Sequence, residues 1–179
     1  MFEKGTIWAY PTDTSFGLGV RADDARTLKR LAELKGRGRE KYFSLMMRDM
    51  EMLREFAEVP EGVSEEFFTQ SPKTAILKPT SKLPQSEYWP TDSVAFRVCT
   101  IPEVAAKIDY PITATSANFS GGKPIFDVWK LKRIFRGRIK IFPHFPELSE
   151  VDPSEIWNFT VSPPERIRGK IPTDYCPSE

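Results

Sequence analysis

Three short polar segments contain the residue types that bind anions. They are residues 10–19 (YPTDTSFGLG), 35–39 (KGRGR) and 112–121 (ITATSANFSG). The first and third are rich in Thr, Ser and Asn, whose short side chains donate hydrogen bonds to phosphate or carboxylate oxygens. The second contributes Lys35 and Arg37, and the glycine between them lets both cations turn toward one ligand. Together the segments predict a single anion-binding site that suits a polyphosphate.

Each segment taken alone also fits a structural role. Residues 10–19 fit a capped turn, and residues 112–121 fit a strand that ends in a turn with an N-cap. Lys35 and Arg37 also suit the C-terminus of a helix, where the helix dipole favours positive charge. The functional interpretation therefore depends on the three segments meeting in space.

Other site chemistries lack the residues that they need. His144 is the only histidine of the chain, and we interpret it as structural. Neither a zinc site nor a Ser-His-Asp triad is expected, and no Asp/Glu cluster indicates a dedicated metal site. Cys99 and Cys176 are the only cysteines and are expected to be reduced thiols.

Length and composition are those of one globular domain. The chain has 179 residues, of which 40% are hydrophobic and 28% charged, enough for one sizeable core. We expect one domain over residues 1–179, with its core at about 6–169 and a frayed tail at 171–179. No stretch approaches the about 18 apolar residues of a membrane span, so no membrane partner and a cytoplasmic location are expected.

The net charge of +1 hides a local asymmetry. Six cations lie between residues 130 and 140, and six glutamates lie between residues 51 and 66. The cationic run, interrupted by apolar residues, suits an RNA backbone but equally suits the solvated face of a helix. Its members are Lys130, Lys132, Arg133, Arg136, Arg138 and Lys140. Any attraction to nucleic acid must therefore be local.

Hydrophobic periodicity predicts alternating strands and helices. Strands are expected at 6–10, 43–47, 74–77, 94–98, 112–114, 139–142 and 156–159, with Ile167 closing the sheet; helices are expected at about 25–35, 50–56, 63–68, 102–108 and 126–135. Asp23 is the expected N-cap of the first helix, and Gly36 its C-terminal stop. The predicted fold is α/β: a single domain with one twisted mixed sheet, parallel and antiparallel, and flanking helices.

In their order and separation, YPTDTSFGLG, KGR and TATSANFSG resemble the YrdC/Sua5/YciO family of threonylcarbamoyl-AMP synthases. The resemblance runs from about residue 6 to residue 169. It implies a YrdC-like (dsRNA-binding-like) fold with a concave positive face. It also implies condensation of L-threonine, bicarbonate and ATP to threonylcarbamoyl-adenylate and pyrophosphate, the first step toward the t6A modification of tRNA. Mg²⁺ would arrive with ATP, and no tightly bound metal is implied. Further implied partners are a tRNA threonylcarbamoyl transferase, and tRNA or double-stranded RNA on the positive face.

The resemblance also assigns roles to single residues. Lys35 and Arg37 match the K-x-R motif and would hold the triphosphate, and Ser116 and Asn118 match the S-x-N motif and would contact ATP; these four are the implied catalytic residues. The other implied nucleotide-binding residues are Lys41, Ser93 and Arg168, and the implied threonine-binding residues are Thr14, Arg97, Ala114 and Ser154. Arg97 would capture the threonine carboxylate through two parallel hydrogen bonds, although a surface ion pair is its alternative role.

Three positions depart from the family pattern. Residues 70–74 (QSPKT) replace a PGPLT-like stretch, residues 154–158 (SEIWN) replace an STVVD-like stretch, and Met46 stands where some synthases have a histidine near threonine. Residues 43–53 (FSLMMRDMEML) resemble the YciO branch. The alternative function is accordingly an RNA-binding or tRNA/ribosome-associated module that binds nucleotide without this synthesis.

Overall fold

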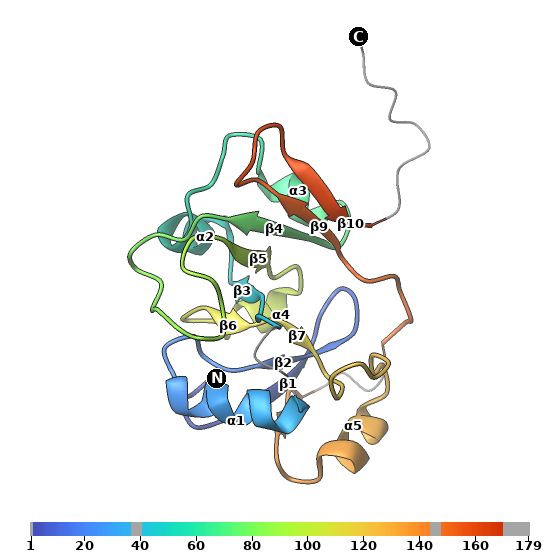
Figure 1. The fold of residues 1–179 in the computed structure, drawn as a ribbon. Helices are drawn as coiled ribbons and strands as arrows, with labels where there is room; N and C mark the ends of the chain where they lie inside the picture. Colours follow the sequence, from blue (N-terminus) through green and yellow to red (C-terminus); the bar gives the residue numbers. More distant parts are fainter. Residues whose placement is uncertain (1, 37–40, 144–147, 170–179) are drawn as a thin grey trace.

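The strands form two twisted sheets. The computed structural model describes residues 2–36, 41–143 and 148–169 (Figure 1). The first sheet has the strand order β7-β2-β1-β8: β1 is Trp8–Pro11, β2 Phe16–Gly19, β7 Thr115–Ser116 and β8 Lys140–Ile141. The second has the order β10-β9-β4-β5-β3-β6: β3 is Leu45–Met47, β4 Lys73–Leu77, β5 Val94–Val98, β6 Ile112–Thr113, β9 Glu155–Asn158 and β10 Glu165–Arg168.

Both sheets are mixed. In the first, β1 pairs antiparallel with β2 and parallel with β8. In the second, β4 is antiparallel to β5 and parallel to β9, while β3 is parallel to β5 and antiparallel to β6. The prediction of a mixed α/β fold is therefore confirmed, whereas the prediction of one continuous sheet is wrong.

The chain changes sheets within the segment that was predicted as one strand at 112–114. Ile112 pairs with Met46 in the second sheet, whereas Thr115 pairs with Leu18 in the first. Between them, Ala114 donates its amide hydrogen to the carbonyl oxygen of Ser44. Thr113 fastens the crossing, since its Oγ1 donates to the carbonyl oxygen of Leu18 at 2.9 Å. This crossing holds the two sheets edge to edge and makes one end of each available to a shared site.

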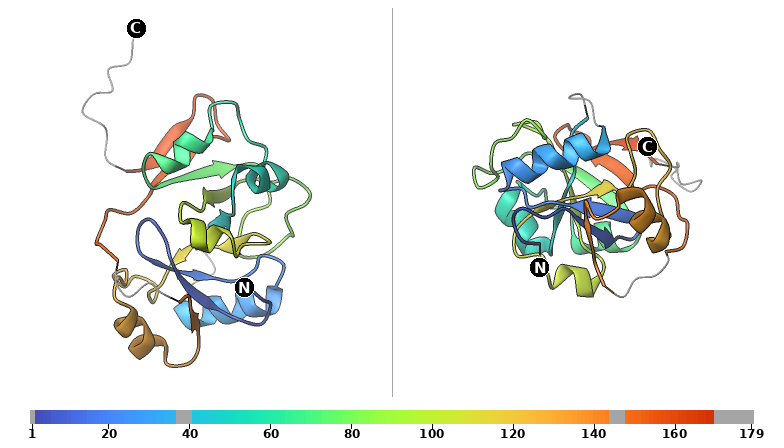
Figure 2. Two further views of the ribbon diagram at one scale, coloured as in Figure 1. Left: turned by 180° about the vertical axis from the view of Figure 1, so that it is seen from behind. Right: turned by 90° about the horizontal axis from the view of Figure 1, so that it is seen from below.

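Five described helices cover the sheets. They are α1 (Ala25–Lys35), α2 (Met50–Phe56), α3 (Glu65–Thr69), α4 (Pro102–Ala105) and α5 (Val128–Phe135). Figure 2 shows α1 and α5 at the end of the molecule that holds β1 and β2, with α2 and α3 beside the second sheet. The helix predictions at 25–35 and 50–56 are confirmed, and the other three are shorter or shifted. None of the described helices has the length and apolarity needed to cross a membrane.

One hydrophobic cluster joins both sheets and includes Tyr10 and Phe16 of the first sheet and Phe96 of the second. Gly19 is needed for this packing. A Cβ atom at residue 19 would lie 2.8 Å from Cε1 of Tyr10, closer than real Cβ contacts. Gly19 therefore accommodates the buried tyrosine ring.

The N-cap of α1 is Asp24, so the prediction of Asp23 is wrong. The Asp24 carboxylate accepts the amide hydrogen of Thr27 at 3.0 Å and that of Gly5 at 2.7 Å. Asp23 instead forms ion pairs with Arg21 and Lys4. Two adjacent aspartates are equivalent in a sequence pattern, and only the local backbone geometry selects one of them.

Replacement of Asp24 by alanine is expected to lower the free energy of unfolding by about 1 kcal/mol, the usual loss for an N-cap. Burial raises the pKa of Asp24, but the hydrogen bonds from Thr27 and Gly5 outweigh this effect and hold the pKa below its ordinary value of 3.8. The ionised carboxylate therefore contributes stability above pH 3.8, and this contribution is lost as the pH falls through the lower folded pKa. Urea unfolding at neutral and acid pH tests this; a pH-independent difference between wild type and Asp24→Ala would contradict it.

Candidate functional site

A cavity of about 310 Å³ opens where the two sheets meet, and both sheets contribute to its lining. Most of its polar lining residues carry hydroxyl groups; these are Thr12, Thr14, Ser15, Tyr42, Ser44, Thr74, Thr115, Ser116 and Ser154. Arg97 and Arg168 are the charged residues among the described lining. Hydroxyl and guanidinium groups are hydrogen-bond donors, so this lining suits a small anion or a ligand with an anionic group.

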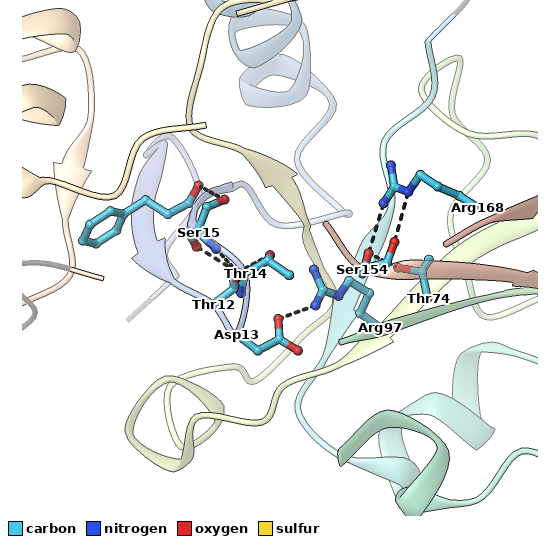
Figure 3. A network of polar contacts seen from close by, with 9 residues as sticks. Thr12, Asp13, Thr14, Ser15, Thr74, Arg97, Ser154 and Arg168 are labelled. Atoms are coloured by element: carbon cyan, nitrogen blue, oxygen red, sulfur yellow. Dashed lines mark hydrogen bonds and ion pairs between the residues drawn. The ribbon is translucent and has the colours of Figure 1, made fainter. Parts of the chain in front are cut away.

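The turn between β1 and β2 forms one wall, and its side chains fix its shape (Figure 3). Oγ1 of Thr12 donates to the carbonyl oxygen of Ser15 at 2.8 Å and accepts the amide hydrogens of Thr14 and Ser15 at 3.2 and 3.3 Å. Thr12 Oγ1 also lies 3.1 Å from Thr14 Oγ1. The capped turn that the sequence suggested for residues 10–19 is therefore present. The same turn places Thr14 in the cavity lining.

Arg97 stands on β5 at the opposite wall and is 8% exposed. Its Nη2 forms an ion pair with Oδ1 of Asp13 in the β1–β2 turn, as Figure 3 shows. Its Nε is buried and has no hydrogen-bond partner among the described residues. The alternative of a surface ion pair does not hold, because this guanidinium is buried at the cavity and has a donor left for a ligand.

Arg168, on β10, completes a network with β4 and β9 (Figure 3). Its Nε donates to the carbonyl oxygen of Ser154 at 3.0 Å and its Nη2 to Ser154 Oγ at 3.1 Å. Ser154 Oγ also lies 3.1 Å from Thr74 Oγ1. Burial, and then the positive charge of Arg97, lower the pKa of Arg168. Two arginines thus face one cavity while Asp13 pairs with only one of them, so the site is positively charged overall.

Lys35 is buried, with 3% of its surface exposed, whereas we expected it at an exposed helix end. Its Nζ donates to the carbonyl oxygens of Ser116 at 2.5 Å and Asn118 at 2.8 Å. The loop after β7 crosses the end of α1, and Ser120 donates its amide hydrogen to the carbonyl oxygen of Lys35 at 2.8 Å. Lys35 therefore supports the S-x-N loop from behind and does not line the cavity itself. Arg37 lies outside the described residues.

Asn118 lies in this loop and outside the cavity lining. Its Nδ2 donates to the carbonyl oxygens of Phe119 at 2.7 Å and Gly122 at 2.8 Å. Its Oδ1 is buried without a hydrogen-bond partner among the described residues. The amide therefore shapes the loop that carries Ser116.

Two predicted nucleotide-binding residues lie apart from the cavity. Ser93 precedes β5, donates to Asp92 Oδ1 at 3.1 Å and lines a separate cleft of about 730 Å³. Lys41 is exposed beside Tyr42, a cavity residue. Because side chains alternate along a strand, Ser93 lies on the same face as Ala95 and Arg97. Ala95 pairs with Ile76 on β4, so a half-buried apolar strip leads from Arg97 toward Ser93.

The cavity brings together six of the predicted residues: Thr14, Arg97, Ala114, Ser116, Ser154 and Arg168. Thr74, Ser44 and Asp13 were not assigned roles from the sequence. Thr74 belongs to the atypical QSPKT stretch, and its register opposite Ile156 brings it to the cavity. Met46, another departure, is buried beside Arg97 in the strand register, where it offers no titratable group.

The chain is similar to known proteins over most of its length. The Sua5/YciO/YrdC family model, described as telomere recombination, matches residues 1–169. A threonylcarbamoyl-AMP synthase from Haemophilus influenzae is 30% identical over 167 residues, which cover 86% of this chain and 87% of that protein. The crystal structure of P. abyssi Sua5 complexed with L-threonine has a TM-score of 0.79 and 29% identity; the match covers 92% of this chain and 50% of that one, so the chain spans about half its length.

The crystal structure of E. coli YciO has a TM-score of 0.78 at 23% identity, covers 92% of this chain and 82% of that one, and supports the fold alone. The similarity to the synthases and the similarity to YciO agree on the same architecture. Because the family model covers nearly the entire sequence, the chain belongs to the Sua5/YciO/YrdC family.

Proposed function

We propose that this protein is an ATP-dependent threonylcarbamoyl-AMP synthase, which condenses L-threonine, bicarbonate and ATP into threonylcarbamoyl-adenylate and pyrophosphate. The observation that carries the proposal is the hydroxyl-lined cavity with Arg97 and Arg168, in a member of this family. Relatives about as similar as the H. influenzae protein have this name, and P. abyssi Sua5 was crystallised with L-threonine. The product would serve the t6A modification of tRNA.

The amino acid would occupy the enclosed part of the cavity. The Arg97 guanidinium would bind its carboxylate, because a buried arginine with unused donors gives strong charge-assisted hydrogen bonds. The hydroxyls of Thr14 and Ser154 and the backbone of Ala114 would then surround the rest of this small substrate. These positions explain why the site has many short polar side chains.

The nucleotide would extend from the cavity along the open face. Ser116, Arg168 and the loop held by Lys35 offer donors and positive charge for the phosphates. The strip of Ile76 and Ala95 offers a half-buried apolar surface for the base, with Ser93 at its far end. Arg37 and Lys41 remain proposed phosphate ligands on the basis of the K-x-R motif.

The chemistry needs positioning more than proton transfer. The carbamate formed from threonine and bicarbonate would attack the α-phosphorus of ATP, and the bond to pyrophosphate would break. Holding both reactants in line and neutralising the leaving group supply the catalysis. Mg²⁺ would enter as part of the ATP substrate, held by phosphates and water. Among the described residues no group of three His, Cys, Asp or Glu side chains could hold it instead.

Pyrophosphate release tests this function. It should require ATP, L-threonine and bicarbonate together, with release at background when any of the three is omitted. ATP binding without threonine-dependent release would contradict the synthase and favour a nucleotide-binding module of the YciO kind.

An exposed cationic surface supports RNA as a further partner. On α5, Trp129 is 70% exposed and the ammonium of Lys132 lies 4.3 Å from its ring centroid. Arg133, Arg136 and Arg138 are also exposed, and none of the three forms an ion pair within the described chain. Such a surface suits a phosphate backbone and an unpaired base. The tRNA and a partner threonylcarbamoyl transferase are therefore proposed partners.

Neutralising Arg133, Arg136 and Arg138 together is expected to weaken binding of a tRNA transcript and to make its salt dependence shallower by about one unit of slope per lost phosphate contact. Fluorescence anisotropy at several salt concentrations measures both quantities. Neutralising Lys78, Lys82 and Lys107, which lie in loops away from α5 in the chain, is the control and should leave both unchanged. Unchanged affinity in the arginine variant would exclude this surface.

A further inference from the structure

The buried ion pair between Asp13 and Arg97 joins the two sheets across the candidate site. Asp13 comes from the β1–β2 turn of the first sheet, and Arg97 from β5 of the second. The side chains of Asp13 and Arg97 are 20% and 9% exposed, so water screens the pair weakly. Figure 3 shows the carboxylate and the guanidinium directed toward one another from these separate segments.

The turn that carries Asp13 is built to hold it still. The Oγ1 atom of Thr12, just before Asp13, makes three hydrogen bonds with the backbone of Thr14 and Ser15, just after it. A turn fixed in this way places the Asp13 carboxylate with little freedom. The Asp13 side chain therefore acts as a fixed point for a long and otherwise flexible arginine side chain.

Asp13 and Arg97 line different cavities. Arg97 lines the main cavity, whereas Asp13 lines a neighbouring one of about 650 Å³. Asp13 takes only Nη2, while Nε is buried without a partner and no described hydrogen bond uses Nη1. Two nitrogens of the guanidinium are thus not used by the described residues.

We propose that Asp13 is a positioning residue for the substrate carboxylate: it fixes the Arg97 guanidinium so that its remaining donors meet the carboxylate of the amino acid. This inference rests on the proposed function and adds a residue to it. A positioning role affects binding of the amino acid and not binding of ATP, whereas a purely structural cross-link between the sheets would affect both. Loss of Asp13 should weaken binding of the amino acid and leave ATP binding nearly unchanged, since the ion pair of Asp13 among the described residues is with Arg97 and not with Arg168.

Three substitutions test this. Asp13→Ala removes the anchor and should raise KM for threonine about tenfold or more, the effect of misplacing one charge-assisted hydrogen-bond partner. Asp13→Asn retains an oxygen that can accept a hydrogen bond from Nη2, so its KM for threonine should lie close to that of the wild type. Asp13→Glu keeps the charge but shifts the carboxylate by one methylene, and should raise KM for threonine while the protein stays folded. KM for ATP should change less than threefold, roughly, in all three variants.

The control is Asp23→Asn, which weakens another partly buried aspartate–arginine pair, with Arg21, away from the cavity. Urea unfolding of every variant separates stability from substrate binding, and Asp13→Glu and Asp13→Asn carry the comparison where Asp13→Ala is unfolded. Equal changes in KM for threonine and ATP, no rescue by asparagine, or the same change in Asp23→Asn would overturn the role of Asp13. A wild type that neither binds threonine in calorimetry nor forms the adduct would overturn the proposed function and this inference together.

Discussion

Replacement of Arg97 by alanine is expected to raise KM for threonine roughly thirtyfold or more, so that threonine-dependent pyrophosphate release is nearly lost at threonine concentrations that saturate the wild type. A charge-assisted pair at a buried site loses about 2–5 kcal/mol when one partner is truncated, and about 1.4 kcal/mol is a factor of ten. The reason is specific to this site, because Arg97 is buried with unused donors at the cavity. Initial rates at varied threonine and fixed saturating ATP measure the effect.

Two variants control for charge and for folding. Arg97→Lys keeps a positive charge but lacks the planar fork of donors, so it should recover little activity. Arg48→Ala removes a half-exposed arginine that pairs with Asp49, and should leave turnover unchanged. Near-normal threonine saturation in Arg97→Ala would remove Arg97 from the substrate site.

Lys35→Met is expected to lose stability and activity together. Methionine keeps the apolar stem but leaves the carbonyl oxygens of Ser116 and Asn118 without their buried ammonium donor. Loss of hydrogen bonds to a charged group costs about 1.5–3 kcal/mol of the free energy of unfolding. We expect turnover to fall more than about tenfold as well, because the same loop carries Ser116 into the cavity. Urea unfolding and turnover are measured on the same preparation.

The matched control for Lys35 is Lys29→Met, since Lys29 is an exposed lysine of the same helix. It should change neither the unfolding midpoint nor the rate. An intact fold with lost turnover in Lys35→Met would instead favour direct contact of Lys35 with the triphosphate, the role that the K-x-R motif implies. Unchanged stability and unchanged turnover would contradict both interpretations.

Local sequence patterns predicted the elements whose own residues have a clear helix or strand pattern. The apolar spacing of α1 and the β-rich run of β5 identified both elements, and the boundary at Gly36 follows from its left-handed φ of 58°. In contrast, β2 was not predicted because half of FGLG is glycine, a residue that disfavours strands. The split into two sheets was also missed, because it depends on the distant strands with which β6 and β7 pair, which a local pattern does not reveal.

The site shows the same division between local and long-range information. The three polar motifs marked Thr14 and Ser116, and the family resemblance added Arg97 and Arg168. The burial of Lys35 was missed because its hydrogen-bond partners, Ser116 and Asn118, lie 81 and 83 positions later in the chain. Asp13 received no role because its partner, 84 residues away, is set by the packing of the two sheets.

The most direct test of the central claim is the mass of the product. We would incubate the protein with ATP, isotopically labelled threonine and labelled bicarbonate, and analyse the nucleotides by mass spectrometry. The account predicts an AMP adduct that carries both labels, formed in step with pyrophosphate. An adduct with only the threonine label, or ATP consumption without any labelled adduct, would contradict the assignment as a threonylcarbamoyl-AMP synthase.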